Sequence, residues 1–309
     1  FRFFMGKSQI DLRVSTFPTV HGENVVMRLL DKAKVILGFD KLGFTPKNLN
    51  KFKKAISRSS GIILVTGPTG SGKTTTLYSA LTYLNNSDRK IITLEDPVEY
   101  EIPLIRQGQI NAKAGFTYAA GMRSILRQDP DIILVGEIRD AETAEIATQA
   151  ALTGHLVFST LHTNDSAGAF PRLVDMGIES FLVSSSVISV VAQRLIRKIC
   201  SDCKTVYEPT EEDLDKLGLK GKTSKYTFYQ GAGCDNCSET GYHGRCAIYE
   251  ILPVSQKIEN MVLQRADGPV IKKVAIEEGM TTLFHDALIK AVNGQTSIEE
   301  VLRVTYTGS

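Results

Sequence analysis

The chain has 309 residues, of which 42% are hydrophobic and 23% charged, values that are ordinary for a globular protein with a substantial core. Its 36 basic and 34 acidic residues leave a formal net charge of +2, which argues against a protein built mainly to bind nucleic acid. No apolar run approaches the ~20 residues that a membrane-spanning helix needs, and we expect neither such a span nor a signal peptide.

The N-terminal segment predicts strands. Ile10–Val14 and Val25–Leu30 are rich in residues that favour strands, and Pro18–Gly22 between them has the composition of a turn. Two or three strands do not make a stable domain on their own. We therefore expect residues 1–36 to be the end of a preceding domain, and the chain, which begins with Phe rather than Met, to be part of a longer one.

A different pattern follows. Residues 37–46 contain two glycines and end in proline, as linkers often do, and Asn48–Ser57 predicts a short helix. Four short apolar runs then predict buried strands: Ile62–Val65, Ile91–Leu94, Ile132–Val135 and Leu156–Ser159. Helical segments such as Ala119–Gln128 and Ala141–Ala151 lie between the runs. Buried strands that alternate with helices predict an α/β fold with a parallel sheet.

The C-terminal half is predicted to be mainly helical. Phe181–Ile199 is the longest mostly apolar stretch, but serines, a glutamine and two arginines interrupt it, so we expect a buried amphipathic helix. Four further segments predict a terminal helical cluster: Ile258–Gln264, Pro269–Glu278, Leu283–Val292 and Ser297–Val304.

The strongest chemical signal is a glycine-rich loop at residues 67–74. The pattern Gly67-x4-Gly72-Lys73-Thr74 follows an apolar strand and precedes a predicted helix, Lys73 to Leu84, which is the context of a phosphate-binding loop. Its backbone N–H groups and the helix N-terminus would hold ATP phosphates, with Lys73 on the β and γ phosphates and the Thr74 hydroxyl on Mg²⁺. The predicted nucleotide-binding residues are Gly67, Pro68, Thr69, Gly70, Ser71, Gly72, Lys73, Thr74 and Thr75.

Acidic residues follow two other predicted strands. Residues 131–137 resemble a Walker B strand, except that Gly136 stands where aspartate is usual and Glu137 comes next. Glu137 could hold Mg²⁺ through water or polarise an attacking water, or it could be an ordinary strand-end glutamate. Glu95, Asp96 and Glu99 follow the second strand, and the carboxyl ends of parallel strands surround the ligand crevice. We expect them to face the same pocket as Lys73, with one or two merely solvated.

Two histidines flank the fourth predicted strand. A histidine at a strand end is usually structural, but His162 is followed by Thr163 and Asn164, which favours it over His155 as a γ-phosphate sensor.

Four of the five cysteines form two CxxC pairs, Cys200/Cys203 and Cys234/Cys237. In a chain without a recognisable secretion signal, this pattern favours a metal over disulfides and implies a reducing compartment, hence the cytoplasm. Four thiolates make a closed Zn²⁺ site, the alternative being four reduced thiols. Cys246 falls outside the spacing and is expected to pack as a small apolar residue.

Taken together, these motifs resemble the secretion ATPases of type II secretion and type IV pilus assembly. The resemblance runs essentially end to end. It is carried by GPTGSGKTTTLY at 67–78, EDPVEY at 95–100, LRQDPDIILVGEIRD at 126–140 and TGHLVFSTLHTND at 153–165. In that family these segments are Walker A, the aspartate box, Walker B and the histidine box, and the family carries Gly-Glu at the positions of Gly136 and Glu137.

The resemblance implies a RecA-like motor core, a hexameric ring and ATP hydrolysis coupled to extrusion of a pilus or pseudopilus. It implies that Glu137 and Glu99 are catalytic acids, and that Arg13 and Arg28 match the arginines with which the preceding domain completes the site. An arginine at the γ-phosphate stabilises the charge that develops during transfer. Solvated arginines on an exposed strand are the alternative, and Arg123 and Arg127 are rival candidates.

The resemblance also sets an expected domain organisation and expected partners. The division is 1–36 as the end of the preceding N2-type domain, 37–46 as a linker, 47–199 as the RecA-like core, 200–250 as the four-cysteine element and 251–309 as a helical subdomain. Inner-membrane platform proteins are the expected partners, and these would hold the ATPase at the membrane. No direct nucleic-acid partner is expected.

Two other classes of function fit the sequence less well. A RecA-like nucleic-acid translocase would favour a basic stripe with aromatics, whereas the cysteine segment mixes Lys204 with several acids and the chain has no tryptophan. A passive nucleotide switch would not need Glu137, Glu99 and the histidine box. Within the secretion family, Gln149–Gly154 and Leu173–Gly177 resemble the type II secretion branch slightly more than pilus assembly.

Overall fold

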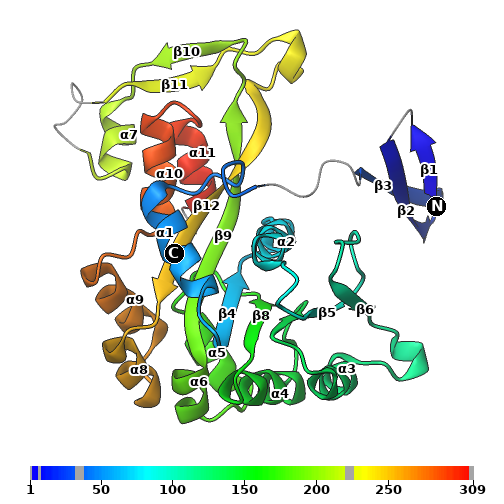
Figure 1. Cartoon of the computed structure of the whole chain (residues 1–309). Coiled ribbons are helices and arrows are strands. Elements are labelled where there is room, and N and C mark those ends of the chain that lie inside the picture. The colour runs from blue at the N-terminus through cyan, green and yellow to red at the C-terminus, as the bar shows by residue number, and fades with distance from the viewer. Residues whose placement is uncertain (1, 6–7, 32–37, 220–225, 306–309) are drawn as a thin grey trace.

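The computed structural model describes residues 2–5, 8–31, 38–219 and 226–305. Figure 1 shows three regions: a small N-terminal sheet, a larger sheet covered by helices, and a smaller region with β10 and β11 at one end of the larger sheet.

The N-terminal sheet is antiparallel, with strand order β1-β2-β3. Its strands are β1 (Arg2–Met5), β2 (Ser8–Thr19) and β3 (Gly22–Asp31). Thr19 pairs with Gly22, so a two-residue turn joins β2 to β3, and Gly22 in this turn has a φ of +123°. The predicted strands and the turn between them are confirmed.

The central sheet has seven strands in the order β12-β9-β4-β8-β7-β5-β6. They are β4 (Gly61–Thr66), β5 (Ile91–Glu95), β6 (Arg106–Gln109), β7 (Ile132–Val135), β8 (Leu156–Leu161), β9 (Val187–Ile199) and β12 (Tyr242–Pro253). All neighbouring pairs are parallel except β12 and β9. The four strands expected from apolar runs form the centre of the sheet, which confirms the α/β class.

Both faces of the central sheet are covered by helices (Figure 1). Ile63 and Val65 of β4 belong to a core shared with α1 (Pro46–Ile56) and α2 (Lys73–Leu84), whereas Ile62 and Leu64 belong to the opposite core. That opposite core includes residues of α3 (Tyr118–Ile125), α4 (Ala141–Leu152), α5 (Ala169–Asp175) and α6 (Ser180–Ser186). Burial on both faces explains why the strands are continuously apolar.

The expectation of one amphipathic helix over Phe181–Ile199 is wrong. The helix α6 ends at Ser186, and the rest of the stretch is the thirteen-residue strand β9. Six of its residues are β-branched and apolar, which favours a strand: Val187, Ile188, Val190, Val191, Ile196 and Ile199. Because β9 pairs with β4 on one side and with β12 on the other, its backbone has hydrogen-bonding partners along its length.

The four C-terminal helices are confirmed, but they pack in two places. They are α8 (Gln256–Leu263), α9 (Gly268–Glu277), α10 (Leu283–Val292) and α11 (Ile298–Thr305). Residues of α8 and α9 join the core of α3 to α6, whereas α10 and α11 form a separate core with β9 and β12. The boundary expected at residue 250 falls inside β12, which belongs to the central sheet.

The cysteine-bearing region lies between β9 and β12 in the chain. It contains the antiparallel pair β10 (Lys204–Tyr207) and β11 (Phe228–Gly231), together with α7 (Glu211–Lys216). Throughout the described residues, none of the helices combines the length and apolar character that crossing a membrane would require.

Candidate functional site

A cavity of about 660 Å³ opens where the central strands end, beside the loop that precedes α2. This size is within the range of small-molecule and cofactor pockets. The cavity brings together sequence-predicted residues that are far apart in the chain. They are Arg28, Thr69, Gly70, Ser71, Gly72, Lys73, Thr74, Thr75, Glu95, Asp96, Glu99, Glu137 and His162.

The glycine-rich loop has the conformation that its sequence predicts. Gly67 and Gly72 have φ values of +146° and +87°, and a Cβ atom on either residue would crowd Gln193 of β9. The helix α2 begins directly after the loop, and within the described chain no side chain caps it at Gly72. Its first-turn N–H groups therefore point toward the cavity as an anion-binding end.

Lys73 lies within this loop. Its Nζ donates to the carbonyl oxygens of Gly67 at 2.8 Å and Pro68 at 3.1 Å. Burial lowers the pKa of Lys73, and the Glu137 carboxylate nearby opposes that shift. The two residues that the motifs predicted to act together are thus electrostatically coupled across one cavity.

Glu137 follows β7 and keeps only 15% of its side chain exposed. Its carboxylate forms an ion pair with Arg139 at 2.6 Å, and its other oxygen lies 3.8 Å from Nε2 of His162. Both partners come from the cavity lining, so Glu137 is held at the cavity wall with its charge partly balanced.

The glycine before Glu137 has a steric explanation. A Cβ atom at Gly136 would lie 3.0 Å from Oη of Tyr118 and 3.2 Å from the carbonyl oxygen of Leu94. An aspartate side chain at this position would require these neighbours to shift by a few tenths of an ångström. The packing of α3 and β5 against the end of β7 therefore leaves little room for the aspartate of the usual Walker B pattern.

Tyr118 and Arg139 line the cavity, and sequence reasoning did not single them out. Burial raises the pKa of Tyr118, and the carboxylates of Glu137 and Asp96 raise it further, so its hydroxyl keeps its proton. Arg139 could have been found from its position two residues after Glu137 in the Walker-B-like segment. Tyr118 carries no such signal, because only the fold brings α3 to this edge.

Glu95 is distinct from the other acids at this edge. It is 5% exposed and accepts hydrogen bonds from Oη of Tyr78, from Thr93 at 2.6 Å and from Gln107 at 3.2 Å. These donors come from α2, β5 and β6, so the Glu95 side chain joins three elements. Of the acids predicted here, Asp96 is exposed and Glu99 is half-buried, and both line the cavity.

The two histidines lie at opposite ends of β8. His162 follows the strand, is exposed and lines the cavity. His155 precedes the strand, and its Nδ1 lies 2.8 Å from the carbonyl oxygen of Ala150 at the end of α4. The structure therefore gives His155 a local structural contact, away from the phosphate loop.

Contacts with α9 and β12 hold the loop that carries His162. Asp165 accepts from the Gly168 backbone at 2.9 Å and forms an ion pair at 2.9 Å with Lys272 of α9. Glu250 of β12, which is fully buried, accepts from both the backbone and the hydroxyl of Ser166, at 2.9 and 2.6 Å. The loop is thus attached to α9 and β12.

The candidate arginines differ in position. Arg28 of β3 lines the cavity together with Leu29. Arg13 pairs with Arg28 in the strand register, and its side chain lies outside the described residues. Arg123 and Arg127 are not among the described residues that line the cavity. Arg123 instead forms an exposed ion pair with Glu142 at 2.6 Å.

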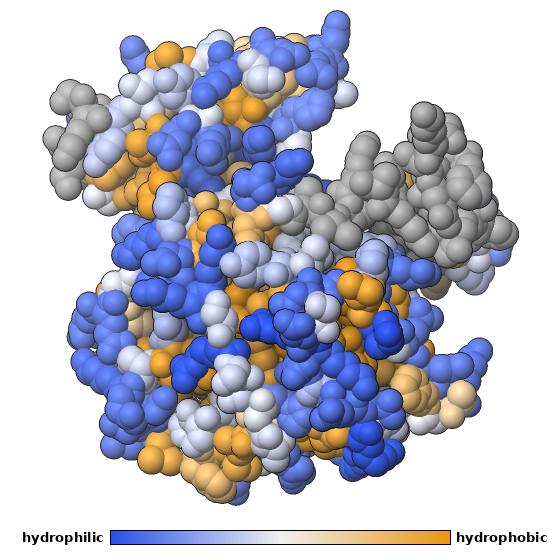
Figure 2. Space-filling model, in the orientation of Figure 1, coloured by the Kyte–Doolittle hydropathy of each residue, from blue (hydrophilic) through white to orange (hydrophobic). Residues whose placement is uncertain are grey.

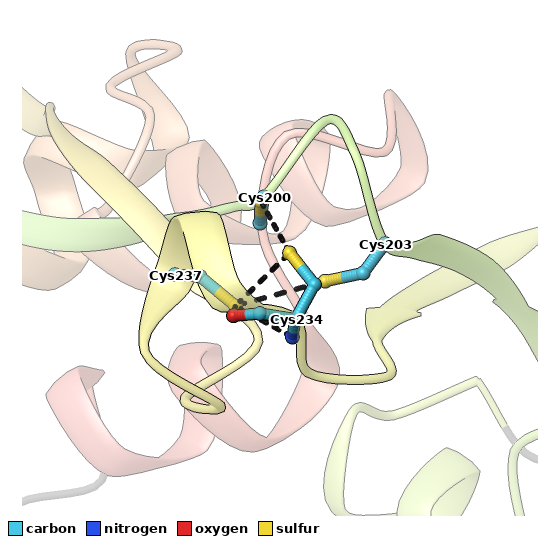
Figure 3. A group of neighbouring side chains, drawn as sticks. All are labelled: Cys200, Cys203, Cys234 and Cys237. Atoms are coloured by element: carbon cyan, nitrogen blue, oxygen red, sulfur yellow. Dashed lines mark hydrogen bonds between the residues drawn. The ribbon is translucent and has the colours of Figure 1, made fainter.

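The four predicted cysteine ligands converge, as Figure 3 shows. Their sulfur atoms are 3.8 Å apart for Cys200 and Cys234, 3.8 Å for Cys203 and Cys237, and 3.6 Å for Cys234 and Cys237. A tetrahedral zinc site with ~2.3 Å bonds to sulfur has sulfur atoms ~3.8 Å apart. The arrangement and the donor set therefore fit Zn²⁺ in a closed, structural site.

The surroundings of the cluster favour the thiolate form of one cysteine, Cys237. Burial raises the pKa of Cys237, but backbone N–H groups of Cys234 and Gly241 and the neighbouring thiols outweigh burial and lower it to about 7. Cys246 lies outside the cluster on β12, half-buried against the core of α10 and α11, as its spacing predicted.

Comparisons with known proteins agree with this geometry. The profile of a family described as type II/IV secretion system protein matches residues 1–303. The type IV pilus assembly ATPase PilB of Thermus thermophilus is 50% identical over 305 residues, which are 98% of this chain and 34% of that protein. The type II secretion system ATPase E of Vibrio cholerae is 50% identical over 301 residues, which are 97% of this chain and 59% of that protein.

This chain thus spans between about a third and three fifths of the length of these relatives. A solved structure of the pilus retraction motor PilT with bound ADP is similar in fold, with a TM-score of 0.71 and 29% identity. That match covers 99% of this chain and 77% of the other.

Proposed function

The chain belongs to the family of type II/IV secretion system proteins, and on this premise we propose that it hydrolyses ATP to power assembly of a pilus-like fibre. The observation that carries the proposal is the cavity, where the phosphate loop faces Glu137 across a space lined by Arg139 and His162. A protein that only bound a nucleotide would not need this acid between two basic partners.

Each cavity residue has a task in this proposal. Lys73 and the N–H groups at the start of α2 bind the phosphates, and the Thr74 hydroxyl would hold Mg²⁺. Mg²⁺ would neutralise charge on the phosphate oxygens. Glu137 orients and polarises the attacking water, while Arg139 and His162 fix its carboxylate. Glu99 acts as the second acid.

Arg28 makes the proposed site depend on the N-terminal sheet. It lines the same cavity as Lys73, although it belongs to β3 and is exposed. An arginine that reaches the γ-phosphate contributes about 10³ to 10⁵ in rate in enzymes that transfer phosphoryl groups. We propose that Arg28, and Arg13 beside it in register, take this role, so that turnover depends on the position of the sheet.

We place the chain in type II secretion, where the fibre is a pseudopilus. Support comes from Gln149–Gly154 and Leu173–Gly177, which resemble that branch slightly more. Type IV pilus assembly is the alternative, because the chain is 50% identical both to PilB of Thermus thermophilus and to the type II secretion ATPase E of Vibrio cholerae. In either system we propose a hexameric ring, attached to the inner membrane through platform proteins on its cytoplasmic side, with the four cysteines binding zinc.

The test uses the natural full-length protein. Its ATP turnover is measured alone, with double- and single-stranded DNA, and with the inner-membrane protein that co-purifies with it. We expect stimulation by the membrane partner and none by DNA, and the identity of the partner separates secretion from pilus assembly. Stimulation by DNA but not by the membrane partner would replace the proposal with a nucleic-acid translocase.

A further inference from the structure

Gln193 is a buried polar residue of β9 that contacts the phosphate loop. Its side chain is 2% exposed, and its Nε2 donates to the carbonyl oxygen of Ser71 at 2.8 Å. Its Oε1 accepts from the hydroxyl of Thr76, in the first turns of α2, at 2.8 Å. One amide side chain therefore joins the loop to the helix that follows it.

The same residue explains two of the loop glycines. The backbone carbonyl of Gln193 occupies the space in which a Cβ of Gly67 would lie, and its Nε2 would be 2.9 Å from a Cβ of Gly72. The loop therefore rests directly on β9 at both ends. Neither the glycine pattern nor the lysine that follows it requires a glutamine on a distant strand, so this contact is a property of the fold.

The contacts continue beyond Thr76. The hydroxyl of Tyr249 on β12 lies 3.3 Å from Oγ1 of Thr76 and donates to the carbonyl oxygen of Leu42 at 3.2 Å. Tyr249 is fully buried, and burial raises the pKa of its hydroxyl, which stays protonated as a donor. Its ring stacks on Phe44, with 3.8 Å between ring centroids.

Leu42 and Phe44 belong to the segment 38–45, which lies between the N-terminal sheet and α1 in the chain. The buried contacts thus form a continuous path from Ser71 through Gln193, Thr76 and Tyr249 to this segment. Leaving a buried carbonyl or hydroxyl group without a hydrogen-bond partner costs more free energy than leaving an exposed one. These hydrogen bonds therefore constrain the positions of both the phosphate loop and the segment 38–45.

We infer that Gln193 is a positioning residue for nucleotide binding, and that Tyr249 couples the phosphate loop to the segment 38–45. The inference rests on the proposed function, because it assigns a binding role to the loop. It goes beyond that function by making the segment after the N-terminal sheet sensitive to nucleotide in the cavity.

The first experiment replaces the amide by an apolar side chain of similar length, Gln193→Met. Binding of a fluorescent ADP analogue with Mg²⁺ is measured by titration, and thermal unfolding is measured without nucleotide. We expect binding to weaken by about ten-fold, the equivalent of one buried hydrogen bond, while kcat at saturating ATP changes by less. Gln149→Met, an exposed glutamine of α4, is the matched control and should bind like the unaltered protein.

A purely structural role for Gln193 makes a different prediction. In that case Gln193→Met would lower the unfolding temperature but leave the affinity of the folded protein unchanged, and this outcome overturns the inference. If Gln193→Met does not fold, Thr76→Val keeps the shape of Thr76 and removes only its hydroxyl. It is expected to weaken binding by about three-fold, and unchanged affinity again overturns the inference.

The second experiment tests the far end of the path with Tyr249→Phe, which keeps the stacking on Phe44 and removes the hydroxyl. Hydrogen exchange of the backbone amides in 38–49 is followed with and without ADP and Mg²⁺. We expect nucleotide to slow exchange there, and Tyr249→Phe to lose at least half of this protection while still binding ADP. Tyr83→Phe, whose exposed ring also contacts Phe39 of this segment, should keep the protection.

Equal protection in Tyr249→Phe and the unaltered protein would overturn the coupling. Failure of the proposed function is distinguishable from both results, because it would appear as absence of ADP binding in the unaltered protein. In that case the affinities of the variants could not be compared at all.

Discussion

The cavity and the cysteine cluster are built in different ways. The cavity gathers Arg28, Lys73, Glu137 and His162 from strands and loops spread over more than a hundred residues, and the order of strands in the central sheet brings them together. The cluster draws all four of its ligands from residues 200–237, and its sulfur atoms are spaced like the corners of a tetrahedral zinc site.

This difference determines what each region depends on. The cluster is held by the β10–β11 pair, the turn at Asp235–Cys237 and the adjoining ends of β9 and β12, and its stability should follow the metal. The cavity requires the whole sheet and also buried polar residues that carry no motif, such as Glu95 and Gln193. We therefore expect changes in one region to leave the other largely intact.

The largest expected effect is that of Lys73→Ala. Without the ammonium group at the phosphate loop, nucleotide binding and turnover should both fall, with turnover reduced by about 10³-fold or more, because preorganised charge stabilises the transferred phosphoryl group. Steady-state phosphate release and nucleotide titration measure the two quantities. Zinc content should stay at one ion per chain. A turnover rate within ten-fold of the unaltered protein would contradict a role of Lys73 in hydrolysis.

Glu137→Gln should separate binding from hydrolysis. The amide keeps the size of the carboxylate but cannot polarise water, so turnover should fall by about 10² to 10⁴-fold while ATP still binds. Single-turnover hydrolysis and nucleotide titration test both parts. Glu142→Gln, on the exposed start of α4, is the control. A Glu137→Gln protein that hydrolyses at a normal rate would contradict the assignment.

The sequence predicted the cavity better than its surroundings. The loop at 67–74, the four central strands and α2 follow from apolar runs and glycine spacing, because these are local properties of the chain. The strand β9 was missed because it is apolar on both faces and lacks the alternation that marks a half-buried strand. Gln193, Tyr118 and Glu250 were missed because their partners belong to other elements that only the fold brings close.

The four cysteines show the opposite case, in which spacing alone was enough. Two CxxC pairs predict a four-thiolate site whatever fold lies between them, and the sulfur positions agree. The sequence pattern does not predict that β12 continues from this region into the central sheet, since Gly241 and Gly244 at its start are residues that favour turns.

Removing zinc tests the independence of the cluster directly. A chelator that strips the metal, or the variant Cys234→Ser, should speed hydrogen exchange in 200–219 and 226–241, because four uncoordinated thiols no longer hold the turns together. Nucleotide affinity should change by less than about three-fold. Metal analysis that finds far less than one zinc per chain in the unaltered protein would contradict the site. A large loss of nucleotide affinity would contradict the separation of the two regions.

The smallest predicted effect concerns the outer support of the cavity, where Lys272 of α9 pairs with Asp165 in the loop that carries His162. Both side chains of this pair are about one third exposed, so it contributes modestly, while Lys272 also lies 3.7 Å from the buried carboxylate of Glu250. Lys272→Met should therefore lower kcat by about three- to five-fold with little change in zinc content. Lys273→Met, the exposed neighbour on the same helix, should have no effect. If the two variants behave alike, α9 does not position the His162 loop, and the cavity depends on fewer distant elements than the contacts of Asp165 and Glu250 imply.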